Sequence, residues 1–498
     1  MPHDGAPGSA AAVNGKSDDP SSIRQRKNPI LNGDSQALIA NDGHIVFSEL
    51  GKEVDKKLDT HQGWEFGGPP GVTAMILGFP VLMYYLWICL TFYDGQLTHP
   101  ESIDDIVPFF SRMWQHVKQD AAPTPYAFAI YTGLMAIQLL LAFIMPGYKQ
   151  EGLPVPSLDY KTLTYNCNAL ASWYATLIIA ATLHWNGIFR LTEIIDNFGS
   201  LMTVSMIWAN IVSVYMYVST VARGEQIRMS GNLIYDFFMG ACLNPRIGSV
   251  DLKMWAEVRI PWVLLFLISV SGACKQYETF GYVTPNMAFM VLATGLYINA
   301  CAKGEECIPQ TWDMFHEKWG WMIIFWNFSG VPFTYCYSIV YMAANDPKKY
   351  EFSTPTYIAL YTTLLCAYYV FDTSMSQKSR FRMQMQGTYQ PRWSFPQLPW
   401  GTLTNPQYIQ TEHGNRLLIS GWWAFLRKPN YTADYIQSLS WSLCIGAASP
   451  IPYFYPVFFF AVLVHRCGRD FERCERKYGK DWDKYCSIVR WRFIPGIY

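Results

Sequence analysis

Long apolar stretches separated by polar segments run from about residue 71 to residue 464 of this 498-residue chain and constrain its fold most. Hydrophobic residues make up 51% of the chain and charged residues only 15%, against about 25% charged residues in soluble domains. A backbone inside a bilayer must satisfy its own hydrogen bonds, which favours helices of about 20 residues. We therefore expect an all-α integral membrane protein, a bundle of about ten transmembrane helices. The expected spans are Gly71–Tyr93, Tyr126–Met145, Leu170–Phe189, Leu201–Val221, Ile260–Ala273, Met287–Cys301, Trp321–Ala344, Tyr357–Phe371, Ile436–Ala448 and Ile451–Val464.

The chain divides into a polar tail and a membrane domain. Residues 1–66 are polar, and we expect most of them to be disordered. They contain no apolar signal-peptide core, so the first span would direct membrane insertion. They carry seven Lys/Arg against ten Asp/Glu, which argues against a nucleic-acid partner. Residues 67–498 form the expected membrane domain, and the sequence Gly330-Val331-Pro332 predicts a kink or break in one of its spans.

The usual sequence signatures of metal, disulfide and nucleotide sites are missing. Twelve cysteines occur without a CxxC pair or a His-rich cluster, and several lie in apolar runs. We interpret them as small hydrophobic residues and expect neither a disulfide framework nor a metal site. No GxGxxG follows a strand, and no GxxxxGK[ST] occurs. Any dinucleotide would therefore have to be held by side chains on helices.

A basic segment follows the eighth expected span. Lys378 and Arg382 are four residues apart, so on a helix they would present two cations to one phosphate-sized target. No acidic residue occurs between Asp372 and Glu412. The positive-inside rule places this segment on the cytosolic side. The alternative use of these cations is anchoring to anionic lipid headgroups.

An aromatic and amide cluster follows at residues 421–431, with the sequence GWWAFLRKPNY. Trp423 and its neighbour offer stacking surfaces for a flat ring. Asn430 can both donate and accept, as recognition of a carboxamide requires, and Tyr431 follows directly. The alternative is an aromatic belt at the membrane interface with snorkelling cations.

The C-terminal segment after Val464 places four chemically distinct side chains at intervals of four residues. They are Arg466, Asp470, Cys474 and Tyr478. On a helix this spacing keeps all four near one face. Ionisable groups at membrane depth are costly and usually mark function. A solvated helix held together by ordinary charge pairs is the alternative.

Another polar patch lies at the edge of a span. Asp313, His316 and Glu317 fall on about one helical turn, as a solvated helix start or as part of a pocket. The HExxH motif of zinc proteases is absent there. Charged residues between 243 and 262, in LNPRIGSVDLKMWAEVRIPW, are interpreted mainly as pairs that fix a loop.

These segments together resemble one known family. The stretches GTYQPRWSFPQLPWGTLTNPQYIQTEHGNRLLISGWWAFLRKPNY and IPYFYPVFFFAVLVHRCGRDFERCERKYGKDWDKYC, with the ending RFIPGIY, are similar to the sterol reductase family, and LNPRIG and HEKWGW fit it too. That family includes the Δ14- and Δ7-sterol reductases and the membrane domain of the lamin B receptor. Within it, PQLPWGTLTNPQYIQTEHGN and RKPNY look like the fungal members that reduce the sterol side chain at the 24(28) double bond.

The resemblance implies a ten-span bundle in the endoplasmic reticulum membrane. It also implies NADPH, held in a cytosol-facing pocket formed mainly by residues 374–498. A sterol substrate, surrounding membrane lipids and other ergosterol-pathway enzymes would be its partners. Lys428 departs from the pattern, since many relatives have His there. The family's cofactor pattern falls on Lys378, Arg382, Trp423, Asn430, Tyr431, Arg466, Asp470, Cys474 and Tyr478.

The implied reaction is the reduction of ergosta-5,7,22,24(28)-tetraen-3β-ol to ergosterol. No carbonyl activates that alkene, so protonation must lead or accompany hydride transfer. Asp470 and Tyr335 are the candidate proton donors. Burial would keep Asp470 protonated, whereas Arg466, one turn away, would favour its carboxylate. The sterol side chain would have to point towards the nicotinamide.

Other functions compete with this one. Δ14 or Δ7 activity would use the same fold and cofactor on the sterol rings. Membrane methyltransferases of the isoprenylcysteine type share a similar terminal element and use S-adenosylmethionine, but the Lys378/Arg382 pair and the ten-span length favour a reductase. A non-catalytic receptor, as the lamin B receptor partly is, would need a basic N-terminal region that this chain lacks.

Overall fold

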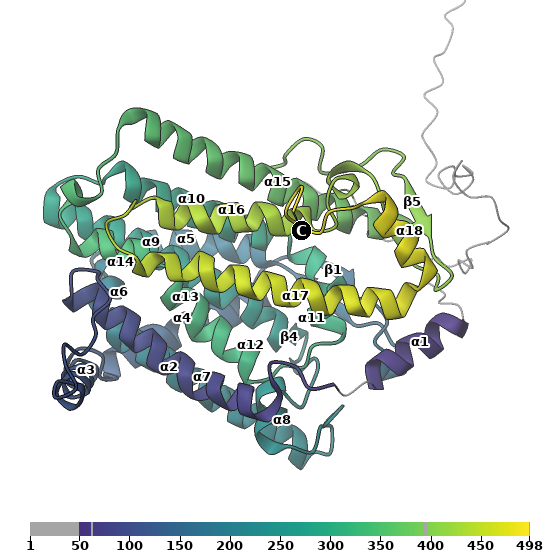
Figure 1. Cartoon of the computed structure of the whole chain (residues 1–498), viewed down its shortest axis with the longest axis horizontal. Helices are drawn as coiled ribbons and strands as arrows, with labels where there is room; N and C mark the ends of the chain where they lie inside the picture. Colours follow the sequence, from purple (N-terminus) through teal and green to yellow (C-terminus); the bar gives the residue numbers. More distant parts are fainter. Residues whose placement is uncertain are drawn as a thin grey trace, which may run out of the picture. The chain divides into compact units, whose positions relative to one another are not determined.

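The computed structural model describes residues 49–60, 63–387 and 396–497, together with residues 389, 391 and 394. Of the predicted tail, residues 1–48, 61 and 62 lie outside this part, and residues 49–60 form helix α1. The described chain is mostly helical (Figure 1). Its strands form three two-stranded antiparallel sheets, β1–β2, β3–β4 and β5–β6. The strands are β1 Tyr148–Glu151, β2 Thr164–Cys167, β3 Arg246–Ile247, β4 Val250–Asp251, β5 Tyr408–Gln410 and β6 Arg416–Leu418.

Six described helical segments are long and apolar enough to cross a membrane, which confirms a multi-pass helical membrane protein. They are α2 Gly68–Phe92, α4 Pro125–Ile144, α7 Phe198–Ala222, α9 Leu252–Phe280, α10 Pro285–Lys303 and the segment Ile451–Tyr478, which contains η7 Ile451–Tyr453 and α17 Phe454–Tyr478. The remaining helices include α1 Glu49–Thr60, α3 Ile106–Asp120, α5 Ala169–Trp185, α6 Thr192–Asp196, α8 Leu233–Met239, η3 Glu305–Gln310, α11 Trp312–Phe315, η6 Gly421–Ala424 and α18 Lys480–Ile488.

The other expected spans lie in helices that are shorter, interrupted or partly polar. Residues 169–185 form a helix of only 17 residues. Tyr357–Phe371 is the apolar half of α15, Thr354–Gln386, whose second half is polar. Ile436–Ala448 overlaps α16, Pro429–Leu443, which has 15 residues. Ten spans were expected and six described segments are long and apolar enough to cross a membrane, because the other four expected spans lie in helices that are too short, interrupted or too polar.

The predicted break at Pro332 is present. The segment consists of α12 Trp321–Phe325, a π-helical turn at Trp326–Gly330, α13 Val331–Thr334 and α14 Tyr337–Ala344. Proline has no N–H with which to bond the carbonyl four residues earlier, here that of Phe328. The hydroxyl of Tyr131 on α4 donates to that carbonyl at 2.7 Å instead. A side chain from another helix thus satisfies the group that the proline leaves free.

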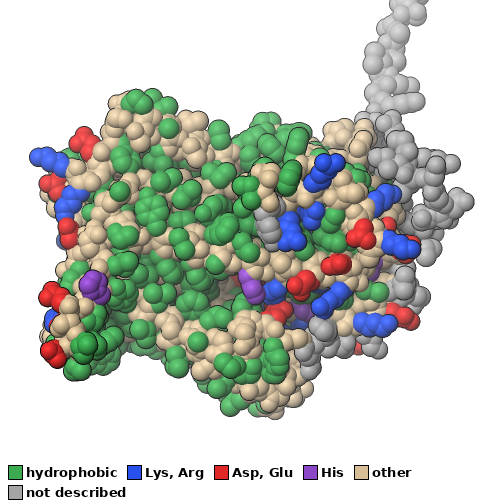
Figure 2. Space-filling model, viewed as in Figure 1, with side chains coloured by type: hydrophobic (Ala, Val, Ile, Leu, Met, Phe, Trp, Pro, Cys, Tyr) green, Lys and Arg blue, Asp and Glu red, His purple; other side chains and the backbone are tan. Residues whose placement is uncertain are grey.

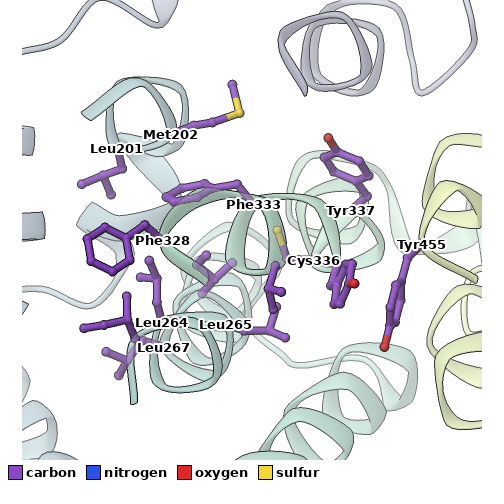
Figure 3. Packing of buried hydrophobic residues seen from close by; sticks show 14 of the residues in the cluster. Leu201, Met202, Leu264, Leu265, Leu267, Phe328, Phe333, Cys336, Tyr337 and Tyr455 are labelled. Carbon is purple, nitrogen blue, oxygen red and sulfur yellow. The ribbon is translucent and has the colours of Figure 1, made fainter. Parts of the chain in front are cut away.

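The largest apolar core joins α2, α7, α9, α10 and the broken segment that contains Pro332. Helix α9 is apolar on most sides, and 67% of the residues in its 18-residue apolar stretch are buried. This is expected for a helix inside a bundle. Figure 3 shows Phe333 between Met202 of α7 on one side and Leu264 and Leu265 of α9 on the other. Tyr455 brings the start of α17 to the same core.

A buried ion pair ties three elements together beneath this core. Arg259 of α9 donates to Glu305 at 2.9 Å and to the side chain of Asn168 at 2.6 Å. The other carboxylate oxygen of Glu305 accepts the N–H of Ala169, the first residue of α5. The side chains of Arg259 and Glu305 are 4% and 1% exposed, so this network fixes where η3 leaves α10.

Three C-terminal helices, α15, α16 and α17, run side by side across one face (Figure 1). On that face hydrophobic side chains cover the middle, and charged ones gather at two opposite edges (Figure 2). One edge lies over the C-terminal half of α17 and over α18. An apolar band between charged borders is the pattern expected of a protein that sits in a bilayer.

Two glycines let two loops touch through their backbones. Gly240 ends α8 with φ 95°, and Gly320 precedes α12. A Cβ on Gly320 would lie 2.1 Å from the backbone N of Gly240, and one on Gly240 would lie 2.6 Å from the N of Gly320. Neither residue can therefore carry a side chain without moving the backbone.

We expect Gly320→Ala to lower the free energy of unfolding by about 3 kcal/mol, the upper end for overpacking, because backbone rather than side chain would have to yield. Gly78→Ala is the matched control, since a Cβ there meets nothing within 4 Å and Ala inside helix α2 is at least as favourable as Gly, so stability should not fall. Thermal denaturation of the detergent-solubilised variants measures both. Equal melting temperatures for the two variants would contradict the close approach.

Candidate functional site

The last part of the chain forms a second apolar cluster, against which three of the predicted site residues, Tyr431, Cys474 and Tyr478, pack. Residues from α17 and α18, together with Ile409, Ile419, Val489 and Phe493, pack into it. The hairpin β5–β6 pairs Tyr408 with Leu418. The structure places the four residues predicted to share a face on one continuous helix, α17.

Lys428 and Asp470 join the start of α16 to the middle of α17. They form an ion pair, and the ammonium also lies 5.3 Å from the ring centre of Tyr431. Burial alone would lower the pKa of Lys428, but the carboxylate of Asp470 raises it above the ordinary value. Lys428 thus provides the counter-ion of Asp470, a predicted catalytic residue.

Two further cations lie beside this pair. The ammonium of Lys378, on the polar half of α15, lies 3.9 Å from the ring centre of Trp423, a distance typical of a cation–π contact. Trp423 is fixed by its own indole N–H, which donates to the carbonyl of Ser374 at 2.9 Å. Burial, and then the charges of Lys428 and Arg382, lower the pKa of Lys378.

The cation cluster, defined here as Lys378, Arg382 and Lys428, has an excess of positive charge. Arg382 donates to the carbonyl of Gln310 at 3.2 Å, and Asp470 pairs with Lys428. Mutually repelling cations that are partly withdrawn from water favour binding of an anion. Such an anion would lie beside the ammonium of Lys378, which rests on the face of Trp423.

Asn430 and Tyr431 begin α16 next to this cluster. The side-chain carbonyl of Asn430 is buried and accepts no hydrogen bond from the described residues. Buried polar groups nearly always have a partner, so this oxygen fits a ligand that carries a donor. The residues present therefore fit a ligand with both anionic groups and an amide, as the dinucleotide implied by the resemblance has.

Arg466 and Arg469 anchor α17 to the segment that carries the other predicted polar patch. Arg466 pairs with Asp313 at 2.5 Å. Arg469 pairs with Glu317 at 2.7 Å and with Glu65 at 2.5 Å. Arg466 is therefore engaged across the bundle, whereas Asp470 on the same helix pairs with Lys428.

Glu317 has a strongly perturbed environment. Burial would raise the pKa of Glu317, but Arg469 above all, then His316 and the indole N–H of Trp312, lower it to about 2. That indole donates to the carboxylate at 2.6 Å. Because the folded-state pKa lies below the ordinary value, Glu317 stabilises the fold fully above pH ~4.5, and this contribution is lost as the pH falls towards 2.

The far end of α17 is covered by α1. Asp55 pairs with Lys477 at 2.9 Å and with His413 at 3.2 Å. The amide of Asn415 donates to the hydroxyl of Tyr478 at 3.2 Å. Cys474 lies one turn before Tyr478 and is half-buried.

Tyr335 lies in the other core, far from Asp470. Its ring stacks on Tyr455 with centres 3.7 Å apart, and its oxygen accepts the indole N–H of Trp326 at 3.3 Å. Asp470 is fifteen residues further along α17 than Tyr455, or about 22 Å at 1.5 Å per residue. The two predicted proton donors are therefore too far apart to serve the same carbon atom.

One carboxyl group was missed by the sequence analysis. Asp434 lies on α16, one turn after Asn430, with its Oδ1 buried and without a partner among the described residues. Its Oδ2 accepts the hydroxyl of Tyr297 at 3.4 Å. The signal available in the sequence was its spacing of four residues from Asn430, the same spacing used for α17.

We expect Arg469→Met to lower the free energy of unfolding by about 3 kcal/mol, because it removes the cation that pairs with the buried carboxylate of Glu317. This is the lower end of the range, since the arginine side chain is 25% exposed. Adding Glu317→Gln should recover part of the loss, since the neutral amide can still accept the indole N–H. Melting temperatures of the two variants at pH 7 test this. A double variant no more stable than Arg469→Met would contradict it.

Comparison with known proteins assigns the chain to a family. The model of the ergosterol biosynthesis ERG4/ERG24 family matches residues 60–498. The chain is 44% identical over 439 residues to the Delta(24(24(1)))-sterol reductase erg4A of Aspergillus fumigatus, covering 88% of this chain and 93% of that protein. It is 42% identical over 460 residues to the Delta(24(24(1)))-sterol reductase of Gibberella zeae, covering 92% and 77%.

A more distant relative is the Delta(14)-sterol reductase of Dictyostelium discoideum, 34% identical over 466 residues, which cover 92% of this chain and 97% of that protein. The family match covers every residue of the site described above except Asp55. It confirms the resemblance inferred from the C-terminal motifs and the assignment as an enzyme. The chain belongs to the ergosterol biosynthesis ERG4/ERG24 family and is a sterol reductase.

Proposed function

We propose that this chain reduces the C24(28) double bond of ergosta-5,7,22,24(28)-tetraen-3β-ol with NADPH and so forms ergosterol, the last step of ergosterol synthesis. The observation that carries the proposal is the identity of 44% and 42% to two proteins named for the Δ24(24(1)) reaction, against 34% to the Δ14-reductase of Dictyostelium discoideum. The Δ14 reaction is the second candidate, because several relatives carry that name.

NADPH would supply a hydride when bound. The cation cluster is the proposed place for its phosphates, because among the described residues three cations there face the single carboxylate of Asp470. Trp423 holds the ammonium of Lys378 over its ring at 3.9 Å, and the oxygen of Asn430, buried without a partner among the described residues, suits an amide donor. The residues proposed to hold the cofactor are Lys378, Arg382, Trp423, Asn430, Tyr431, Arg466, Asp470, Cys474 and Tyr478.

The chemistry requires an acid. The alkene has no activating carbonyl, so a proton must be added at C28, which leaves a tertiary, allylic cation at C24 that accepts the hydride. Asp470 pairs with Lys428, which favours its carboxylate and suits a role in fixing the cofactor site. Tyr335 lies at the deep aromatic cluster around Tyr455, where the sterol side chain would have to arrive.

The proposed setting is the endoplasmic reticulum membrane, with the C-terminal region facing the cytosol and residues 67–498 acting as the catalytic membrane domain. Charged side chains gather at the end of α17 and on α18 (Figure 2), and the basic residues of the polar half of α15 lie at the same end. The positive-inside rule supports a cytosolic position for them. NADPH is available on that side.

The direct test is an assay of the purified chain with NADPH and ergosta-5,7,22,24(28)-tetraen-3β-ol, with the sterol product identified by gas chromatography and mass spectrometry. We expect ergosterol. The chain without NADPH is the control. Reduction of a Δ14 or Δ7 substrate alone would overturn the side-chain reaction and leave the fold and cofactor in place.

We expect Lys378→Met to raise the Kd for NADPH at least about tenfold, a loss of about 1.4 kcal/mol, because one of three clustered cations is removed. Fluorescence titration of NADPH measures this without turnover. Lys275→Met is the matched control, since Lys275 pairs with Asp196 on the surface. A Kd for Lys378→Met within twofold of the wild type would contradict the proposed phosphate site.

A further inference from the structure

One face of α16 carries a row of polar groups that have no hydrogen-bond partner in the described part of the chain. Asn430, Asp434, Gln437 and Trp441 follow one another at intervals of four, three and four residues, which places them on one face of the helix. The Oδ1 atoms of Asn430 and Asp434, both polar atoms of the Gln437 amide and the indole N–H of Trp441 are all buried without a partner among the described residues. We call these four residues the α16 polar row.

Such a row is unusual. Buried polar atoms in proteins are bonded in about nine cases out of ten, and each one left unpaired costs about 1–3 kcal/mol. Gln437 and Trp441 are each 1% exposed, so bulk water does not reach them. Several buried polar groups without partners in a row are expected where a bound ligand or ordered water forms the missing hydrogen bonds.

Asp434 is the acidic member of the row, and its surroundings differ from those of Asp470. No cation pairs with Asp434 among the described residues, and its one hydrogen bond is the 3.4 Å contact from the hydroxyl of Tyr297. Asp470 pairs with Lys428. A carboxyl withdrawn from water without a cation favours its protonated form, whereas one beside an ammonium favours the carboxylate.

An aromatic wall connects Asp434 to Tyr335. The ring of Tyr297, which bonds Asp434, lies 5.6 Å from that of Trp441. Trp441 lies 5.6 Å from Tyr455, and Tyr455 stacks on Tyr335 at 3.7 Å. Aromatic faces of this kind stabilise a developing carbocation. Asp434 thus borders the aromatic cluster that the reaction above requires, in a place that Asp470 does not reach.

Asp434 is also close to the proposed cofactor site. It follows Asn430 by four residues, one helical turn or about 6 Å along the axis. An acid on α16 can therefore face a carbon atom that also receives a hydride near Asn430. The same helix would hold the amide end of the cofactor and the proton donor in fixed register.

We propose that Asp434 is the acid that protonates the sterol alkene, and that the α16 polar row completes its hydrogen bonds with the bound ligands and with water that returns the proton. This inference rests on the proposed function only in that some sterol alkene is reduced. The carboxyl O–H bond of Asp434 breaks, and the alkene electron pair forms the new C–H bond. The cation left on the neighbouring carbon accepts the hydride of NADPH, and the Asp434 carboxylate regains a proton from water.

The test compares Asp434→Asn and Asp434→Glu with the wild type, on whichever sterol the wild type reduces. We expect Asp434→Asn to lower kcat at least about 100-fold, the usual contribution of a positioned acid, with the Kd for NADPH within twofold of the wild type. Asp434→Glu should keep part of the activity and shift the pH at which kcat falls on the alkaline side. Asp196→Asn, a surface carboxylate paired with Lys275, should behave like the wild type.

Two results would overturn the proposal. One is kcat of Asp434→Asn within threefold of the wild type. The other is a pH profile in which kcat falls at the same alkaline pH in Asp434→Glu as in the wild type, which would leave Asp434 a structural role. This second result decides the question even if Asp434→Asn fails to fold. A wild type that reduces no sterol at all would instead reject the proposed function, so the two failures are distinguishable.

Discussion

The pairing of charges along α17 is the constraint on which the C-terminal part of this protein depends. Arg466, Arg469 and Asp470 occupy a helix that is continuous with an apolar span, where unpaired charges are expensive. Each finds its partner on a different element: Asp313 before α12, Glu317 in the same segment, and Lys428 at the start of α16. These pairs set the position of α17 against two other parts of the bundle, and with it the positions of the side chains between them.

Much of the fold and part of the site could be predicted from the sequence. The length of the apolar stretches predicted membrane-spanning helices, and Pro332 predicted the break in the segment around it. The four-residue spacing predicted that Arg466 and Asp470 lie on one helix. Spacing could not reveal that Arg466 pairs with Asp313, 153 positions away, rather than with Asp470. Such partners depend on tertiary packing. Asp434 was missed because it stands alone beside an apolar run, and its burial without a partner for Oδ1 among the described residues becomes visible only in the folded chain.

The structure separates two carboxyl groups that a motif search would rank in the opposite order. Asp470 belongs to a cluster of recognisable residues and pairs with Lys428, which neutralises its negative charge. Asp434 belongs to none of the motifs singled out in the sequence, and within the described part of the chain its partner is the phenol of Tyr297. Environment rather than residue type assigns such groups to electrostatic or acidic roles. A helix that begins with a cation and an amide and continues with an acid would combine both proposed roles in about two turns.

The contact of α1 with α17 bears on where the folded domain begins along the chain. The family match begins at residue 60, whereas Asp55, before that boundary, pairs with Lys477 and His413. An expression boundary chosen by homology would delete this carboxylate and leave two largely buried bases facing one another. The physical domain is therefore longer than the homologous one, and recombinant forms intended for structure determination should start upstream of Glu49.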